Sequence, residues 1–564
     1  MYLTPGTLRR SDFGESIATP RARSLLPPLK PIRSESNASN PASRMLPELL
    51  ACLFEFVRDA DPPSRSRDAT CRGCLGWIHV THVCQSWREA GIGHPHLWTD
   101  VDFNVLPHPW IKTFLTRSKA MPIHVTLDGG RSDTGDDLDI PAMIALIAAQ
   151  SVTERLQTLR ILSATFLHSC LALVNGLQLF VHPAPNLKEL YILPGEQRWD
   201  HLRFDLPPHL FSGTAPRLTT LGIGSFPIPF NFLLLGNLTH LEMSLDIAHR
   251  YSDQPAHLSV LFDRMPKLRA LYLRRLNQSD GREVDLTPLP RPIRLPPTLR
   301  YLCIKGNVAL VAFTLNFTIP PAARVSVRPL CWSAGISTAL TALLLPHCAA
   351  PLRPLKTLAL TVDGSVGAVL DAWQMPAAIA KRKKPDLHFE FPREWPARYS
   401  GCVHLPMHEV QEIHFHICCN IGNRCCPEEG LTAFHAMREA QSVRRLYCGM
   451  PLSSTCRQAA GFPVLIGLLP TPSTSPAHPV DDALHGAAPT DGLIPFPSLE
   501  TLKINDTTKD GLPEDEIFVD ALVDCLRQRM DHDLRLCLLT LPPRFDKPQW
   551  AAALQPLARE VRFG

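Results

Sequence analysis

The sequence predicts a mixed α/β protein in which a small all-helical module near the N-terminus precedes a long α/β solenoid of repeated units. Between residues 45 and 87, apolar residues recur three and four positions apart, which is the spacing of one helix face. After residue 150, a unit of the form Leu-x-x-Leu-x-Leu recurs ten times, which favours stacked turn-and-strand repeats. The chain has 564 residues and 55 prolines, so we expect several short elements rather than one compact core.

Two segments of the helical module carry the apolar spacing. The first stripe contains Leu46, Leu49, Leu50, Leu53, Phe54 and Val57, and the second contains Val80, Val83, Cys84 and Trp87. Pro47 suits the start of a helix, where its missing N–H would have no partner in any case. Two or three short helices within about 60 residues cannot cover this much apolar surface themselves, so we expect part of it to contact a partner.

The order of these residues resembles the F-box. The resemblance is carried by Leu46-Pro47 with Leu49-Leu50 opening the first helix, Val83-Cys84 with Trp87 closing the second, and Leu97-Trp98 with Val101 at the end. The last group is similar to the version found in F-box-like proteins of mushroom-forming fungi, the basidiomycetes. One departure is a polar insertion at 58–74, longer than this family usually carries, although loop closure costs little extra with length. The alternative is an ordinary buried helical hairpin without a partner.

The repeated units determine the architecture of the rest of the chain. They are Leu156–Ile161, Leu187–Ile192, Leu218–Ile223, Leu238–Met243, Leu268–Leu273, Leu299–Ile304, Leu355–Leu360, Val410–Phe415, Val443–Cys448 and Leu499–Ile504. Several units follow one another at steps of 30 or 31 residues. Two wider steps of 56 residues, from 299 to 355 and from 443 to 499, each predict about two units. Candidate additional strands are Arg324–Val327 and Asp386–Phe391, and helices are expected at 140–147, 258–262 and 517–526.

The unit resembles the leucine-rich repeat, although it is long and irregular for that family. Burying its three apolar side chains contributes roughly 1.5–3 kcal/mol each. Ordering the backbone costs about 1–2 kcal/mol for every residue, so a unit should be stable only when it is stacked on others. The alternative is a different α/β protein with leucine-rich strands.

These patterns divide the chain into five parts. We expect a disordered tail at 1–41, an F-box-like domain at 42–103, a connecting segment at 104–150, a repeat array at 151–545 and a C-terminal tail at 546–564. The connecting segment should contain a helix near Trp110 and a strand at 122–127. A Pro-, Ser- and Gly-rich stretch at 470–495 predicts a flexible loop inside the array.

Composition argues against several classes of function. A formal net charge of +4 gives no basic footprint for nucleic acid, and no apolar run is long enough to span a membrane. The first residues contain no secretory signal and the 17 cysteines have no regular spacing, so we expect reduced thiols in an intracellular, cytoplasmic or nuclear protein. Lys381–Lys384 could serve nuclear import, but a solvated loop explains it better. No nucleotide-binding or nucleophile motif is present, so we expect neither an enzyme nor a cofactor.

One segment rich in histidine and cysteine is a candidate metal site. It contains His414, His416, Cys418, Cys419, Cys425 and Cys426, and alternation along a strand would place both histidines on one face. Zinc accepts such ligands, but adjacent cysteine pairs are poor chelators, so structural thiols are the favoured interpretation. Cys71 and Cys74 have a suitable spacing but stand alone. We therefore expect no metal.

The F-box resemblance implies a function. Such proteins bind the adaptor Skp1 of a cullin–RING ubiquitin ligase through the helical module, and the repeat array would bind a protein substrate. The residues expected to contact Skp1 are Leu46, Pro47, Leu50, Leu53, Val83, Cys84 and Trp87. Val83 and Trp87 could instead fill the core of the module. The rival functions are a repeat scaffold that never meets a ligase, and a hydrolase or metalloenzyme within the array.

Overall fold

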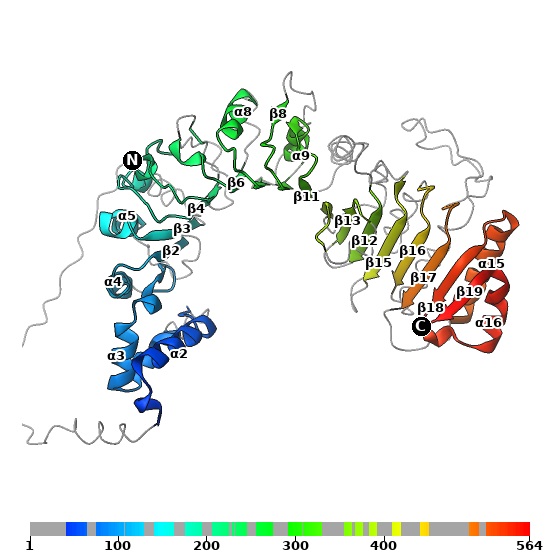
Figure 1. Cartoon of the computed structure of the whole chain (residues 1–564), viewed down its shortest axis with the longest axis horizontal. Coiled ribbons are helices and arrows are strands. Elements are labelled where there is room, and N and C mark those ends of the chain that lie inside the picture. Colours follow the sequence, from blue (N-terminus) through cyan, green and yellow to red (C-terminus); the bar gives the residue numbers. More distant parts are fainter. Residues whose placement is uncertain are drawn as a thin grey trace, which may run out of the picture. The chain divides into compact units, whose positions relative to one another are not determined.

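The protein forms two compact units, one within residues 1–98 and 116–119 and the other within 99–115 and 120–564. The computed structural model (Figure 1) describes residues 41–64, 75–106, 108–128, 140–162, 175–193, 206–224, 228–229, 232–244, 255–274, 292–306, 308–329, 355–363, 367–375, 383–391, 409–418, 440–450, 496–506 and 515–564. In these ranges no helix combines the length and the apolar character needed to cross a bilayer.

The first unit is built from short helices. They are η1 (Pro41–Arg44), α2 (Pro47–Ala60), η2 (Gly76–His82), α3 (Gln85–Gly93) and η3 (Pro95–Trp98). Pro47 is the first residue of α2, as its missing N–H favours. The core between these helices contains Leu50, Phe54, Trp77, Ile78, Leu97 and Trp98, which are all fully buried. The indoles of Trp77 and Trp98 pack edge to face with their centroids 4.9 Å apart, an arrangement that stabilises aromatic pairs.

The second apolar segment does not form the single helix that its spacing suggests. Gly76–His82 is a 3₁₀-helix, Cys84 has an extended backbone, and α3 begins only at Gln85, so Trp87 lies in the first turn of a helix rather than at the end of one. Ile78, Val80 and Thr81 are β-branched, which disfavours a continuous α-helix. The Thr81 hydroxyl also donates to the Ile78 carbonyl (2.8 Å), a local hydrogen bond that competes with helical pairing.

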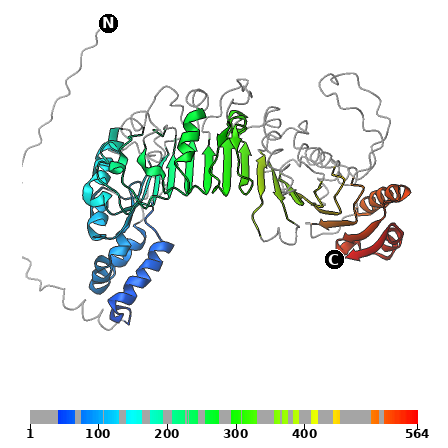
Figure 2. The same cartoon turned by 45° about the horizontal axis from the view of Figure 1, so that its top comes forward.

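The second unit is a mixed α/β structure with a large, mostly parallel sheet of 17 strands among the described residues (Figure 2). The strands of the first part are β1 (Asp100–Asp102), β2 (Ile123–Asp128), β3 (Leu156–Leu162), β4 (Glu189–Leu193), β5 (Thr220–Ile223), β6 (His240–Ser244), β7 (Ala270–Arg274), β9 (Tyr301–Gly306) and β11 (Arg324–Pro329). Those of the second part are β12 (Thr357–Asp363), β13 (Gly367–Trp373), β14 (Leu387–Phe391), β15 (Glu412–Cys418), β16 (Arg445–Met450), β17 (Thr501–Asp506), β18 (Leu536–Leu541) and β19 (Ala558–Phe563).

The register of this sheet confirms the repeated strands. The second leucine of each unit pairs with its counterpart in the next strand, in the series Leu159, Leu190, Leu221, Leu241, Leu271 and Leu302. All six are completely buried. Because neighbouring strands bring the same position of each unit together, one apolar row becomes continuous across the sheet.

Three strands interrupt the chain order. After β11 the sheet continues with β14, β13 and β12, and β12 then pairs with β15. Strand β13 is antiparallel to both of its neighbours. The candidate strands at 324–327 and 386–391 are therefore confirmed as β11 and β14, but β14 precedes β12 in space. Strand β16 pairs directly with β17, so the extra unit expected between 443 and 499 adds no strand there.

Helices and short turns lie between the strands. They are α4 (His108–Arg117), α5 (Ile140–Ala148), α6 (Gln150–Thr153), η4 (Leu210–Gly213), η5 (Leu233–Leu235), α8 (Pro255–Asp263), α9 (Val308–Thr314), α15 (Asp515–Asp531), η9 (Pro543–Phe545), α16 (Pro548–Leu554) and η10 (Gln555–Leu557). Strands β8 (Ile293–Arg294) and β10 (Phe317–Thr318) form a separate parallel pair. The helices expected at 140–147, 258–262 and 517–526 are confirmed as α5, α8 and α15.

The segment 104–150 contains the helix near Trp110 and the strand at 122–127 that the sequence predicts, as α4 and β2, and β2 joins the sheet. The segment 546–564 differs from its expected character, because it was expected to be a tail and contributes β19 to the sheet. Both strands are held by parallel pairing to a neighbour. The tail up to residue 40, most of the polar insertion and the loop at 470–495 lie outside the described residues.

Candidate docking surface

One face of α2 exposes large apolar side chains. We call this face the α2 stripe and define it as Leu46, Leu49, Cys52, Leu53 and Phe56. The exposed fractions are 63 % for Leu46, 55 % for Leu49, 39 % for Leu53 and 75 % for Phe56, and Cys52 is an exposed free thiol. The spacing of three and four residues places these side chains on one side of the helix, starting from its N-cap residue Leu46.

The opposite side of α2 is packed against the rest of the unit. Leu50 and Phe54 are completely buried, and the Phe54 ring lies 5.3 Å from the Trp87 ring of α3. Trp87 also donates its indole N–H to the Ala42 carbonyl (3.0 Å). The unit therefore has its own core, and the α2 stripe does not contribute to it.

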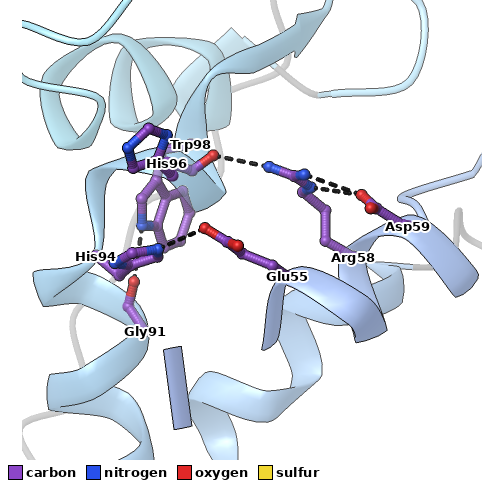
Figure 3. Close-up of polar contacts among 7 residues, drawn as sticks. All are labelled: Glu55, Arg58, Asp59, Gly91, His94, His96 and Trp98. Carbon is purple, nitrogen blue, oxygen red and sulfur yellow. Dashed lines mark hydrogen bonds and ion pairs between the residues drawn. The ribbon is translucent and has the colours of Figure 1, made fainter. Parts of the chain in front are cut away.

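Polar contacts fix α2 against α3 and η3 (Figure 3). The Glu55 carboxylate pairs with His94 Nε2 (2.7 Å), and Arg58 donates to the His96 carbonyl (2.9 Å). The Trp98 indole N–H donates to the Gly91 carbonyl (2.9 Å) and so joins η3 to the end of α3. These contacts orient α2 so that the stripe faces away from the core.

Gly76 is required where the chain returns to the end of α2. It has a φ of +56°, and a Cβ there would meet the backbone of Asp61 and Pro62 at 2.5–2.7 Å. The next residue, Trp77, donates its backbone N–H to the Asp61 carbonyl (2.8 Å). A side chain at position 76 would both strain the backbone and prevent this close approach.

The seven residues expected to contact a partner fall into three groups by their exposure. Leu46, Pro47, Leu53 and Val83 are exposed, with Val83 at 60 %, whereas Cys84 and Trp87 are half-buried. Leu50 is completely buried, because its side chain fills the core between α2 and its neighbours. Trp87 packs and hydrogen-bonds inside the unit.

The sequence reasoning missed Phe56 and Cys52 and did not select Leu49. Leu49 belongs to the apolar spacing, but Phe56 lies only two residues after Phe54, a separation that places the two rings on different sides of a helix. The helical repeat contains the missing signal, since positions 49, 53 and 56 share one side of a helix while 50 and 54 share another. The apolar spacing alone does not separate the exposed face of α2 from its buried face.

The histidines of the possible metal site lie on β15. His414 and His416 are on one strand face, as alternation predicts, because they pair in register with Tyr447 and Gly449 of β16. His414 stacks on Tyr447 and donates a hydrogen bond from Nε2 to the buried Glu412 carboxylate (2.8 Å). Burial, and then the neighbouring His414, lowers the pKa of His416. The stacking and the hydrogen bond give His414 structural partners.

No cluster of three or more metal-ligating side chains occurs within the described residues. Cys419, Cys425, Cys426, Cys71 and Cys74 lie outside them. Among the described residues, the cysteines that form no disulfide include Cys52, Cys84, Cys303, Cys448, Cys525 and Cys537. Burial raises the pKa of Cys525 to about 12, so this thiol stays protonated and inert near neutral pH.

The comparisons with known proteins add no family. No protein-family model matches the chain, and no curated protein is significantly similar to it. The functional argument therefore depends on the residues themselves, and above all on the exposed apolar side chains of α2.

Proposed function

We propose that the protein is the substrate-recognition subunit of an SCF-type (Skp1–cullin–F-box) ubiquitin ligase. Its helical unit is an F-box-like domain that binds a Skp1-like adaptor, and its sheet unit is a leucine-rich-repeat-like solenoid that binds a protein substrate. The protein acts in the cytoplasm or the nucleus. It makes and breaks no bonds itself, but raises the effective concentration of the substrate near the charged ubiquitin-conjugating enzyme.

The α2 stripe is the observation that carries this proposal. Leu46, Leu49, Leu53 and Phe56 remain exposed although the helical unit has a complete core of its own. Covering each of these side chains with a partner would contribute roughly 1.5–3 kcal/mol before the costs of association are subtracted. An apolar helix face of this kind suits another helical surface, because side chains spaced by three and four residues fit the grooves between facing helices.

The repeated strands support the substrate-binding role. Six consecutive units place equivalent leucines in one buried row, while polar side chains face outward between them. Stacked repeats of this type offer an extended surface that can differ from repeat to repeat. The sheet unit would therefore supply specificity, and the helical unit would supply the connection to the ligase.

The test is recovery of the adaptor with the purified full-length protein. Leu49→Asp places a charge in the middle of the α2 stripe and should reduce recovery of a Skp1-like adaptor at least tenfold. Leu233→Asp is the matched control, because Leu233 has nearly the same exposed fraction, 54 %, but lies in the sheet unit. Recovery with Leu233→Asp should equal that of the wild type.

Thiol labelling gives a second measurement on the unmodified chain. Cys52 is exposed within the α2 stripe, so it should react readily with a maleimide in the free protein and become protected when the adaptor binds. If the wild-type protein recovers no adaptor, or if Cys52 reacts equally in both states, the ligase function is excluded. A repeat scaffold without a ligase would then be the better interpretation.

A further inference from the structure

One edge of the large sheet is formed by β19 (Ala558–Phe563), a strand of six residues (Figure 1). Among the strands that the structure describes, β19 pairs only with β18, in a parallel register. The other edge of β19, which we call the open edge, therefore has no partner strand within the described ranges. An unpaired edge of this length is a template on which a strand of another chain can pair.

The hydrogen bonding to β18 identifies the backbone groups that point to the open edge. Gly564 donates its N–H to the Leu541 carbonyl of β18 (3.0 Å), so the backbone of Gly564 faces β18. Consecutive residues of a strand direct their backbone groups to opposite sides, so every second residue before Gly564 faces β18 as well. The residues between them direct N–H and C=O to the open edge, and they are Arg559, Val561 and Phe563.

The side chains of β19 carry both signs of charge on one face. Glu560 and Arg562 lie two residues apart on this face and pair with each other (2.6 Å), yet both remain exposed, at 53 % for Glu560 and 61 % for Arg562. On the opposite face, Val561 is only half-buried, although its register partner Leu539 of β18 is completely buried. The apolar row that β18 buries is therefore incompletely covered at β19.

A second copy of β19 fits the open edge in an antiparallel register centred on Val561. In this register Val561 lies opposite Val561 of the second copy, Glu560 lies opposite Arg562, and Arg559 lies opposite Phe563. Each carboxylate would gain a second guanidinium, and each Phe563 ring would gain a neighbouring cation. The backbone fits the same register, because the three residues that point to the open edge face one another and can exchange about six hydrogen bonds.

The charges of β19 disfavour the neighbouring antiparallel registers. A register centred on Glu560 would place the two carboxylates opposite each other, and one centred on Arg562 would do the same with the two guanidinium groups. Like charges directly opposite one another destabilise a sheet. The register centred on Val561 is therefore the one in which the charges of this strand complement themselves.

The other edge strand of the sheet lacks these properties. Strand β1 (Asp100–Asp102) has only three residues, and its charged side chains, Asp100 and Asp102, are both acidic. A second copy of β1 would be repelled, and short length together with like charge is a common protection of a sheet edge. The longer and self-complementary β19 has neither form of protection.

We propose that two copies of the protein associate through β19 and form a symmetric homodimer in which the sheet continues from one chain to the other. A two-fold axis between the two Val561 residues relates the copies, so the contact is isologous and closes at two chains. A strand of six residues is smaller than a standard interface, so we expect the dimer to form as the concentration is raised. This inference goes beyond the proposed function and does not depend on it.

Charge exchange on β19 tests the inference in the full-length protein, with sedimentation velocity over a concentration series as the measurement. Glu560→Arg and Arg562→Glu each place like charges opposite one another and should weaken dimerisation at least tenfold. The double variant Glu560→Arg/Arg562→Glu restores opposite charges and should dimerise as the wild type does. Glu500→Arg is the matched control, because Glu500 has nearly the same exposed fraction, 52 %, and also pairs with an arginine, but lies beside the inner strand β17.

A backbone variant tests the hydrogen bonds separately from the charges. Val561→Pro removes an N–H that points to the open edge and leaves the bonds to β18 in place, a position at which an edge strand tolerates proline. It should abolish dimerisation without changing the circular dichroism spectrum. Val561→Thr keeps the N–H and should retain the dimer.

Three results would overturn the inference: a wild type that stays monomeric up to about 0.1 mM, a double variant that does not recover dimerisation, or equal weakening by Glu500→Arg and Glu560→Arg. A dimer that is lost in Leu49→Asp but retained in Glu560→Arg would place the contact on the α2 stripe and would also overturn it. Species larger than a dimer would indicate head-to-tail pairing of β19 with β1, which does not close, instead of the symmetric contact.

Adaptor recovery separates this inference from the proposed function. Glu560→Arg should recover a Skp1-like adaptor as the wild type does, because β19 is remote in sequence from the α2 stripe. Dimerisation without adaptor recovery would exclude only the ligase, and adaptor recovery by a protein that never dimerises would exclude only the β19 contact.

Discussion

The helical unit and the sheet unit distribute their apolar residues in opposite ways. Five of the ten large apolar side chains that are exposed in the described ranges, namely Leu46, Leu49, Leu53, Phe56 and Val83, lie in the short helical unit. In the sheet, units such as Leu187–Ile192 bury all three of their apolar positions completely. The exposed apolar side chains of the helical unit therefore mark a surface that the sheet unit does not have in its repeated strands.

The difference follows from the number of neighbours that each element has. A strand inside the sheet is covered by equivalent residues on both sides, so its apolar row is continuous and closed to water. Helix α2 packs on α3 and η3 along one side only, which leaves the other side open.

The two sides of α2 provide the strongest test of this comparison. Phe54→Ala removes a completely buried ring that packs on Trp87, and should destabilise the helical unit by about 3–5 kcal/mol. Phe56→Ala removes a ring that is 75 % exposed on the same helix, and should change stability by less than about 0.5 kcal/mol. Hydrogen exchange of α2 amides, followed by mass spectrometry, measures both effects.

Partner binding should depend on the exposed phenylalanine, although stability depends on the buried one. Phe56→Ala should reduce adaptor recovery while leaving the exchange of α2 amides unchanged. If both substitutions destabilise α2 equally, the α2 stripe is part of a core, and the contrast between the two units is lost.

The sequence predicted most of the sheet because its signal is local. The three apolar positions in the pattern of Leu187–Ile192 predict a buried strand, and several copies follow one another at steps of 30 or 31 residues. The observed register follows from repeating this pattern. The order of β12, β13 and β14 could not be predicted, because spatial order depends on the connections between strands and not on their apolar pattern. Strand β13 also lacks the leucine spacing altogether.

The candidate site was predicted less well than the sheet. The spacing around Leu46 correctly placed an apolar helix, but it could not separate Leu50, which is buried, from Leu49, which is exposed. That distinction depends on which side of α2 meets Trp87 and η3, and this is a property of tertiary packing. The break at Cys84 was missed for a similar reason, since it arises from local hydrogen bonds of η2.

Two glycines of the sheet, Gly222 and Gly449, lie directly against a neighbouring ring. Substituting them tests whether packing between side chains on this face contributes to the stability of the sheet unit. A Cβ at Gly222 would lie well inside van der Waals contact of the Tyr191 ring, and one at Gly449 would do the same with His416. Gly222→Ala should therefore destabilise the sheet unit by about 1–3 kcal/mol, as overpacking does. Urea unfolding followed by circular dichroism measures the change.

A control and a rescue make the glycine experiment specific. Gly236→Ala has no neighbour within 4 Å and a φ of −63°, so it should be neutral or should stabilise by up to about 1 kcal/mol. Adding Tyr191→Ala to Gly222→Ala should restore part of the lost stability by making room for the new Cβ. Failure of this rescue would locate the defect in the backbone instead of the ring.

The smallest effect should come from an exposed ion pair on the sheet. Arg160→Gln breaks the ion pair with Glu189 and a cation–π contact with Tyr191 at 5.3 Å, and should cost up to about 1 kcal/mol of unfolding free energy. The part of this cost that comes from the ion pair should shrink towards zero in about 1 M salt, where charges are screened beyond roughly 3 Å. A cost that persists unchanged in high salt would mean that the packing of the guanidinium on the Tyr191 ring, and not the ion pair, provides the stabilisation.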